Sequence, residues 1–203
     1  MRILLLGANG RTGGEVIEKA LQMGDEVTAV VRDASRALPL AHQRLRKVVG
    51  DVCDPSFLTE IAPGHDLVVS TLGPRMPTSG AARIYSDSAS AMVAGLRDTD
   101  VERMLVTSSG LLDSEQSVCG KVLRAVVPRI VEEAGKMESC IQGSTLRLTI
   151  VRTGFLNDKP SDSFKVDSQA GAISRRAVAN FLVKECHARQ YLDEVVGLCS
   201  QAR

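Results

Sequence analysis

The sequence predicts a doubly wound α/β fold, in which helices cover both faces of a mostly parallel sheet. Apolar or β-branched runs of strand length alternate with segments of helical spacing along the whole chain. A glycine-spaced turn follows the first run directly. With 203 residues, the chain is long enough for one domain with a sizeable core. We therefore expect a single domain over 1–203 with strand order 3-2-1-4-5-6, which allows a seventh strand at one edge.

The first third of the chain predicts four strands. Continuous apolarity at Ile3–Leu6 predicts a strand that is covered on both faces. The strands after it are expected at 26–31, 45–49 and 66–72. Thr12 and Glu15 have capping-box spacing, so we expect this pair to cap the first helix. Asp54 followed by Pro55 predicts the start of a second helix.

The rest of the chain continues the alternation. Helices are expected at 81–97, from Pro128 to about Gly143, and after a cap at Ser174. Strands are expected at 103–107 and 148–151, with a last edge strand at 195–199. The segment 157–170 is polar and predicts a loop, and 111–127 gives no clear period.

Composition excludes several classes of function. A formal net charge of +1 with scarce aromatic residues and no Trp argues against a nucleic-acid or anionic membrane surface as partner. An odd cysteine count without CxxC spacing predicts reduced thiols in a cytoplasmic protein. The histidines lack metal-ligand spacing, and no apolar run approaches the ~20 residues that cross a bilayer. We expect a small-molecule substrate, no metal, and a monomer or homodimer.

The turn after the first strand has the spacing of a phosphate-binding loop. Gly7, Gly10 and Gly13 form G-x-x-G-x-x-G between a buried strand and a helix. Glycine lets the backbone approach a pyrophosphate without a Cβ in the way, and the helix start directs N–H groups at the phosphates. The alternative is that these glycines only make a tight turn. The context favours a Rossmann-type dinucleotide-binding domain.

The end of the second strand distinguishes NADP from NAD. An acidic side chain there binds the ribose hydroxyls of NAD, whereas a basic one accommodates the 2′-phosphate of NADP. The sequence places Arg32 at this point, with Arg11 in the glycine turn and Arg36 nearby. A guanidinium suits a phosphate monoester because it donates two parallel hydrogen bonds. Asp33 keeps NAD as the second choice, and the alternative for Arg32 is a solvated strand-end charge.

Several segments together carry a family resemblance. The chain contains, in this order, GANGRTGGEV, VTAVVRD, VVGDV, DLVVSTLG, VTSSG and LTIVRTG. With these it resembles the atypical short-chain dehydrogenase/reductase family. More narrowly, it resembles the NmrA-like and biliverdin reductase B (flavin reductase)-like NAD(P)H-binding proteins. The resemblance covers nearly the whole chain, and its motifs specify the fold and the cofactor better than the substrate.

The resemblance implies that residues at the carboxyl ends of the strands hold the cofactor. Those implied at the pyrophosphate are Gly7, Asn9, Gly10, Arg11, Thr12 and Gly13. Arg32 would meet the 2′-phosphate, and Asp51 and Val52 would flank the adenine. Leu72 and Gly73 would line the cofactor ribose beyond the fourth strand. Beside the nicotinamide, the implied neighbours are Thr107, Ser108, Thr153, Gly154 and Phe155.

The chain departs from the wider superfamily at the catalytic helix. Typical members carry Tyr-x-x-x-Lys there, but this chain has Glu132 at the tyrosine position and Lys136 at the lysine position, with Tyr85 and Tyr191 elsewhere. The catalytic candidates are Ser108, which would orient the substrate or the carboxamide, and Lys136, which would hold the ribose. The alternatives are a strand-end cap for Ser108 and an exposed i,i+4 ion pair for Glu132 and Lys136.

The resemblance implies an NADPH-dependent oxidoreductase that needs no tyrosine on this helix. Planar acceptors such as flavins, quinones and conjugated tetrapyrroles qualify, because solvent can supply the proton and the site mainly supplies proximity. The alternatives are a non-catalytic NAD(P)H-sensing regulator of the NmrA-like type, and an isomerase or dehydratase with tightly held cofactor. The substrate site is expected from the loops 74–84, 110–128 and 155–170.

Overall fold

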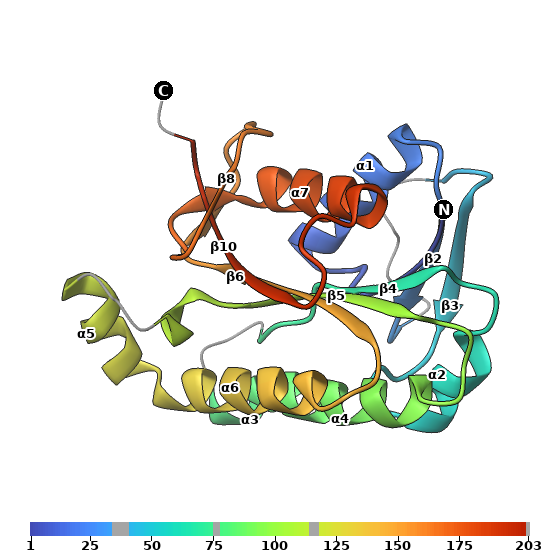
Figure 1. The fold of residues 1–203 in the computed structure, drawn as a ribbon, viewed down its shortest axis with the longest axis horizontal. Helices are drawn as coiled ribbons and strands as arrows, with labels where there is room; N and C mark the ends of the chain where they lie inside the picture. Colours follow the sequence, from blue (N-terminus) through green and yellow to red (C-terminus); the bar gives the residue numbers. More distant parts are fainter. Residues whose placement is uncertain (34–40, 75–77, 114–117, 202–203) are drawn as a thin grey trace.

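The computed structural model describes residues 1–33, 41–74, 78–113 and 118–201. Its centre is an eight-stranded sheet of order β3-β2-β1-β4-β5-β6-β10-β8 (Figure 1). In that order the strands are Leu45–Val49, Glu26–Val31, Arg2–Leu6, Leu67–Ser70, Arg103–Ser109, Arg147–Thr153, Glu194–Cys199 and Lys165–Asp167. All neighbours pair in parallel except β8, which is antiparallel to β10. The predicted fold class and strand order are confirmed.

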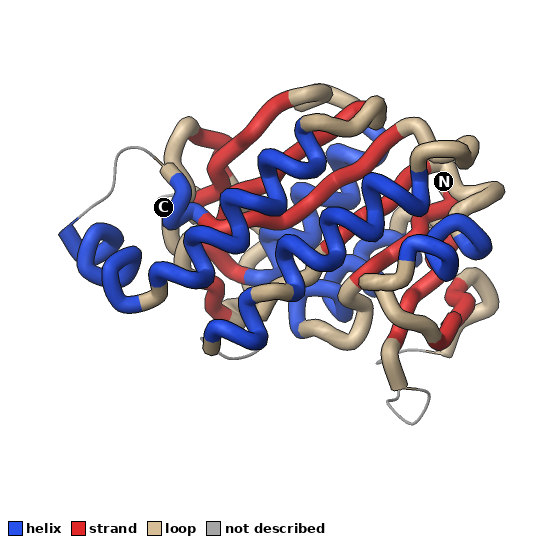
Figure 2. The backbone as a smooth tube through the Cα atoms, turned by 90° about the horizontal axis from the view of Figure 1, so that it is seen from below, coloured by secondary structure: helices blue, strands red, loops and turns tan. Residues whose placement is uncertain are grey.

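Helices form a layer on each face of the sheet (Figures 1 and 2). One layer contains α1 (Arg11–Gln22) and α7 (Arg175–Ala188). The other contains α2 (Pro55–Ile61), α3 (Ser79–Ala82), α4 (Ile84–Leu96) and α6 (Pro128–Gln142). A 3-10 turn, η1 (Gly110–Leu112), and α5 (Val118–Val126) follow β5, and α5 projects beyond the end of the sheet (Figure 1). Two short strands, β7 (Leu156–Asn157) and β9 (Ile173–Ser174), pair with each other.

The core explains the continuous apolarity of β1. Ile3 and Leu5 pack into the cluster beneath α1 and α7, while Leu4 and Leu6 pack into the cluster on the opposite face. All of these side chains are fully buried. A strand in the middle of a doubly covered sheet has no face toward solvent, which explains why residues 3–6 of β1 are all apolar.

The structure corrects three expectations about individual elements. The polar segment 157–170 is not one loop, because β8 lies within it and pairs with β10. Consequently β10, expected at the edge, is an interior strand between β6 and β8. Gly197 permits this arrangement, since a Cβ there would lie 2.5 Å from the backbone of Gln169. The expected helix 81–97 is divided at Arg83 into α3 and α4.

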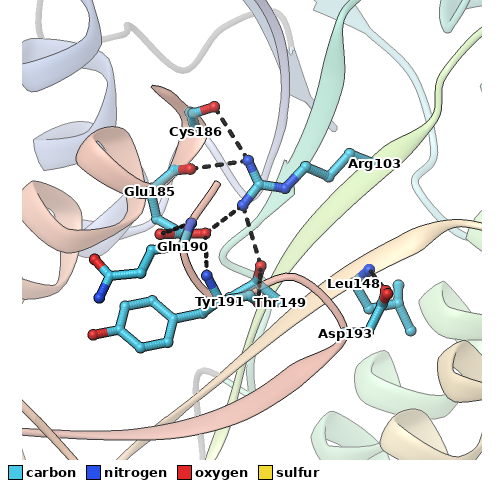
Figure 3. A network of polar contacts seen from close by, with 8 residues as sticks. All are labelled: Arg103, Leu148, Thr149, Glu185, Cys186, Gln190, Tyr191 and Asp193. Atoms are coloured by element: carbon cyan, nitrogen blue, oxygen red, sulfur yellow. Dashed lines mark hydrogen bonds and ion pairs between the residues drawn. The ribbon is translucent and has the colours of Figure 1, made fainter. Parts of the chain in front are cut away.

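A buried ion pair fastens α7 to the start of β5 (Figure 3). Arg103 Nη1 donates to the carbonyl oxygens of Glu185 (2.9 Å) and Cys186 (3.1 Å) at the end of α7. Its Nη2 donates to Glu185 Oε1 at 2.6 Å, and the two side chains are only 3% and 2% exposed. The Glu185 carboxylate also accepts hydrogen bonds from the backbone N–H groups of Gln190 and Tyr191. Both buried charges are therefore paired, and the last carbonyls of the helix gain donors.

We predict that Arg103→Leu lowers the free energy of unfolding by about 3–5 kcal/mol, because it leaves the Glu185 carboxylate buried without its cation. The control is Arg129→Ala, which removes an exposed ion pair with Glu132 and should cost less than about 1 kcal/mol. Chemical denaturation measures both free energies. Equal losses in the two variants would contradict the anchoring role of Arg103.

Candidate functional site

The glycine turn brings the end of β1 against the start of α1. Gly7 has φ +88°, in the left-handed region that favours glycine. A Cβ at Gly13 would lie 2.3 Å from the carbonyl oxygen of Gly7, well inside any real contact. The N–H of Gly10 donates to that same oxygen at 2.9 Å. The turn thus requires glycine both for its backbone conformation and for the close approach of helix to strand.

The start of α1 differs from the predicted capping box. The helix begins at Arg11 with Gly10 as its N-cap residue, so Thr12 lies inside the first turn. No side chain caps the helix. The close contact of Gly13 with Gly7 sets the start of the helix, and this tertiary constraint overrides the local spacing of Thr12 and Glu15. An uncapped start leaves backbone N–H groups and the positive end of the helix dipole for an anion.

A cavity of about 890 Å³ lies beside this turn, at the carboxyl end of the sheet. The end of β2 and the segments that follow β3 and β4 contribute to its wall, together with α3 and the first turn of α4. Predicted cofactor residues that line it are Gly7, Asn9, Gly10, Arg32, Asp51, Val52, Leu72 and Gly73. Its size is within the range of cofactor sites, and it lies at the edge where ligands bind in such sheets.

Arg32 is the cation at the end of β2 that faces this cavity. Its side chain is exposed, and it forms no ion pair with any other residue that the structure describes. Asp33, which follows it, is also exposed and also lines the cavity. Arg36 lies outside the described residues. The strand end therefore presents both a guanidinium and a carboxylate to the cavity.

Arg11 forms an ion pair and does not line the cavity that Arg32 faces. Asp158, in the segment 157–163 that we name the strap, bridges Arg11 (2.9 Å) and Arg175 of α7 (2.6 Å). The hydrogen bond from Arg175 lowers the pKa of Asp158 below its usual range. A second strap carboxylate makes the same kind of bridge, from Asp162 to Lys19 of α1 (2.9 Å) and Arg176 of α7 (2.8 Å). The strap is thereby held along α1, at Arg11 in its first turn and Lys19 in its last turn, by cations from both helices.

Ser108 belongs to a buried polar cluster beneath the end of β5. Its hydroxyl donates to Glu138 Oε1 of α6 at 2.5 Å, and the residue is 3% exposed. Arg152 of β6 donates to both oxygens of Glu138 (3.0 and 2.7 Å) and to Asp113 (3.1 Å). These hydrogen bonds, that of Glu138 first, raise the pKa of Arg152. Sequence reasoning missed Glu138, although its helical spacing with Ala134 and Ile141 places it on the buried face of α6.

The remaining predicted residues do not line the cavity around the glycine turn. Thr107 donates to the carbonyl of Ser70 (3.3 Å), Thr153 is buried against the carbonyl of Ser108 (3.4 Å), and Phe155 is 62% exposed. Lys136 lies on the outer side of α6. Its Nζ is 2.8 Å from both Glu132 and Glu133, so the expected i,i+4 ion pair with Glu132 is confirmed. A ribose-binding role for Lys136 stays a prediction.

The described ranges lack two kinds of feature. No helix within them combines the length and apolarity needed to cross a membrane. Among the same residues, no three or more His, Cys, Asp or Glu side chains gather as metal ligands would.

Comparison with known proteins identifies related sequences. Residues 7–189 match the family model described as NAD(P)H-binding. The uncharacterized protein YwnB of Bacillus subtilis is 31% identical over 106 residues, which are 52% of this chain and 46% of that protein. The photosystem II assembly factor Ycf39 of Cyanophora paradoxa is 25% identical over 139 residues, which are 66% of this chain and 42% of that protein. The matches thus span less than half the length of these curated relatives.

Solved structures share the fold over nearly the whole chain. The oxidoreductase ylbE from Lactococcus lactis has a TM-score of 0.86 at 14% identity, covering 99% of this chain and 91% of that one. A short-chain dehydrogenase/reductase from Veillonella parvula, in complex with NADP, has a TM-score of 0.80 at 18% identity, covering 99% and 95%. A putative NADH-flavin reductase from Streptococcus pneumoniae has a TM-score of 0.76 at 19% identity, covering 99% and 100%. At these identities the likeness shows the fold.

We predict that Gly13→Ala weakens dinucleotide binding at least tenfold and lowers stability, since the new Cβ would displace the helix from the end of β1. Gly135→Ala is the matched control within a helix, because a Cβ there meets Leu112 at an ordinary 3.6 Å. That control should raise stability by about 0.5–1 kcal/mol and leave binding unchanged. Calorimetric titration and chemical denaturation measure these effects, and unchanged affinity in Gly13→Ala would contradict the role of the turn.

Proposed function

The chain belongs to the NAD(P)H-binding family, and from this premise we propose that it is an NADPH-dependent oxidoreductase that passes hydride to a small planar acceptor such as a flavin or quinone. The observation that carries the proposal is the uncapped start of α1 in the same cavity wall as Arg32. An exposed helix start and a guanidinium without an ion pair within the described residues suit a ligand with a pyrophosphate and a further phosphate.

In this proposal, the ends of successive strands would contact successive parts of the dinucleotide. Backbone N–H groups at the start of α1 would hold the pyrophosphate, which Gly10 allows to approach the backbone. Arg32 would donate to the 2′-phosphate, while Asp33 would disfavour it by charge repulsion. Asp51 and Val52, after β3, would flank the adenine. The bound cofactor would supply a hydride at the far end of the site.

The proposed acceptor class follows from the absence of the family's catalytic tyrosine on α6, where this chain has Glu132. Neither predicted catalytic side chain lines the cavity, since Ser108 is hydrogen-bonded to Glu138 and Lys136 is paired with Glu132. The proposal therefore gives these two side chains no chemical step. Hydride transfer to flavins or quinones needs little acid catalysis, so orientation of the two reactants suffices. The similarity to a putative NADH-flavin reductase agrees with this class.

A non-catalytic NAD(P)H-sensing protein is the second candidate. It is favoured by the same observation, that Ser108 and Lys136 both contact protein groups rather than the cavity. The two candidates differ in turnover. A panel of flavins, quinones and aldehydes, with NADPH oxidation followed by absorbance, separates them: binding without oxidation of NADPH by any acceptor supports the sensor.

We predict that NADPH binds at least tenfold more tightly than NADH, and that Arg32→Glu abolishes or reverses this preference because it replaces the 2′-phosphate donor with a like charge. Arg97→Glu makes the same charge change at the opposite end of α4, away from the cavity, and should keep the preference. Isothermal titration calorimetry with both dinucleotides measures the ratio. Equal affinities in the wild-type protein would refute the 2′-phosphate assignment.

A further inference from the structure

Helix α5 (Val118–Val126) presents apolar side chains to solvent. Val122 and Val126 are 59% and 70% exposed, and their spacing of four residues places them on one face of the helix. Of the seven large apolar side chains that are exposed within the described ranges, these two alone share a helix or strand. Helices of a globular domain usually turn their apolar face to the core. The face of α5 that carries the two valines does the opposite, as a contact surface would.

The position of α5 in the fold leaves this face open. The helix projects beyond the end of the sheet, and its main contacts are with η1 and α6 (Figure 1). Leu123 and Val127 are half-buried, whereas Lys121, Arg124 and Ala125 are exposed like the two valines. A helix of nine residues is marginally stable in water by itself. Contact of its open side with a second surface would therefore stabilise it.

Cations accompany the exposed valines. Lys121 and Arg124 are three residues apart and so share a flank of α5, and neither forms an ion pair with a residue that the structure describes. The third cation between 118 and 131 is Arg129, which pairs with Glu132, and the sequence has no Asp or Glu within that range. The whole-chain net charge of +1, from which we expected no anionic membrane partner, averages over this local concentration.

An anionic lipid surface fits both features of α5. Apolar side chains of an amphipathic helix enter the boundary between headgroups and acyl chains, and long Lys and Arg side chains reach the headgroup phosphates. A second copy of the chain would instead bring the same cations to the interface, where like charges repel. A helix of this kind lies on a membrane without crossing it, which agrees with the lack of a membrane-crossing helix in the described ranges.

We propose that α5 docks the protein on an anionic lipid surface, with Val122 and Val126 at the boundary of the acyl chains and Lys121 and Arg124 at the headgroups. Because α5 follows β5 through η1, the docked helix leaves the sheet at its carboxyl edge, where the cofactor cavity also lies. The inference goes beyond the proposed reductase function and does not depend on it.

The first test is co-sedimentation of the full chain with vesicles. Its partition into phosphatidylcholine vesicles that contain phosphatidylglycerol should exceed its partition into phosphatidylcholine alone at least about fivefold. About 1 M NaCl should abolish this excess, because the screening length falls to about 3 Å. Equal partition into the two kinds of vesicle, or none into either, overturns the inference.

The second test removes the apolar face. Val122→Ser combined with Val126→Ser should lower partition into the anionic vesicles at least about fivefold. The matched control, Met23→Ser combined with Val49→Ser, changes two exposed apolar side chains outside α5 and should keep the wild-type partition. Wild-type partition in the α5 variant would mean adsorption by charge alone and overturns the inference. So does a wild-type dimer that this variant loses in ultracentrifugation without lipid, because the face would then bind a second copy.

The third test removes the charges of α5. Lys121→Gln combined with Arg124→Gln should lower the same partition at least about fivefold. Arg46→Gln combined with Arg97→Gln makes an equal charge change at exposed positions outside α5 and should stay within about twofold of wild type. An equal loss in the two variants would show that only the net charge of the protein matters, and it overturns the assignment to α5.

Discussion

The contact between Gly13 and the carbonyl of Gly7 is the constraint on which the ligand site depends. It fixes how closely α1 approaches β1, and so where the uncapped start of the helix points. Because β1 pairs with β2 on one side and β4 on the other, the ends of those strands are held around the same point. Arg32 and Gly73 therefore reach one cavity although they are far apart in sequence.

Much of the fold could be predicted because its signals are local. In β1, which is covered on both faces, residues 3–6 are all apolar and buried. Asp54 followed by Pro55 specified the start of α2, where the Asp54 side chain accepts from the N–H of Ser56. The capping-box prediction failed because spacing reports only local hydrogen-bonding options, whereas a close approach elsewhere decided where the helix begins. Interior charges such as Arg103 and Glu185, 82 residues apart, have no signal in a single sequence.

The candidate site also has one part that could be predicted from the sequence and one part that could not. The end at which we expect the phosphates is formed by one contiguous motif and could be predicted from residue types alone. The side chains expected at its far end lie on separate elements, so the partnership of Ser108 with Glu138 does not follow from spacing. On α6, the i,i+4 positions that face β5 are Ala134 and Glu138, two residues beyond the pair that was matched to the family motif.

The strap links ligand affinity to ionic strength. Asp158 and Asp162, whose side chains are 61% and 43% exposed, hold it beside α1 through ion pairs with cations of α1 and α7. Attraction between such charges falls as salt shortens the screening length, which is about 8 Å under physiological conditions. Salt also weakens the electrostatic attraction between an exposed guanidinium and a phosphate. A rise in salt would therefore loosen the strap from α1 and α7 and, by the same screening, weaken the attraction of Arg32 for a phosphate.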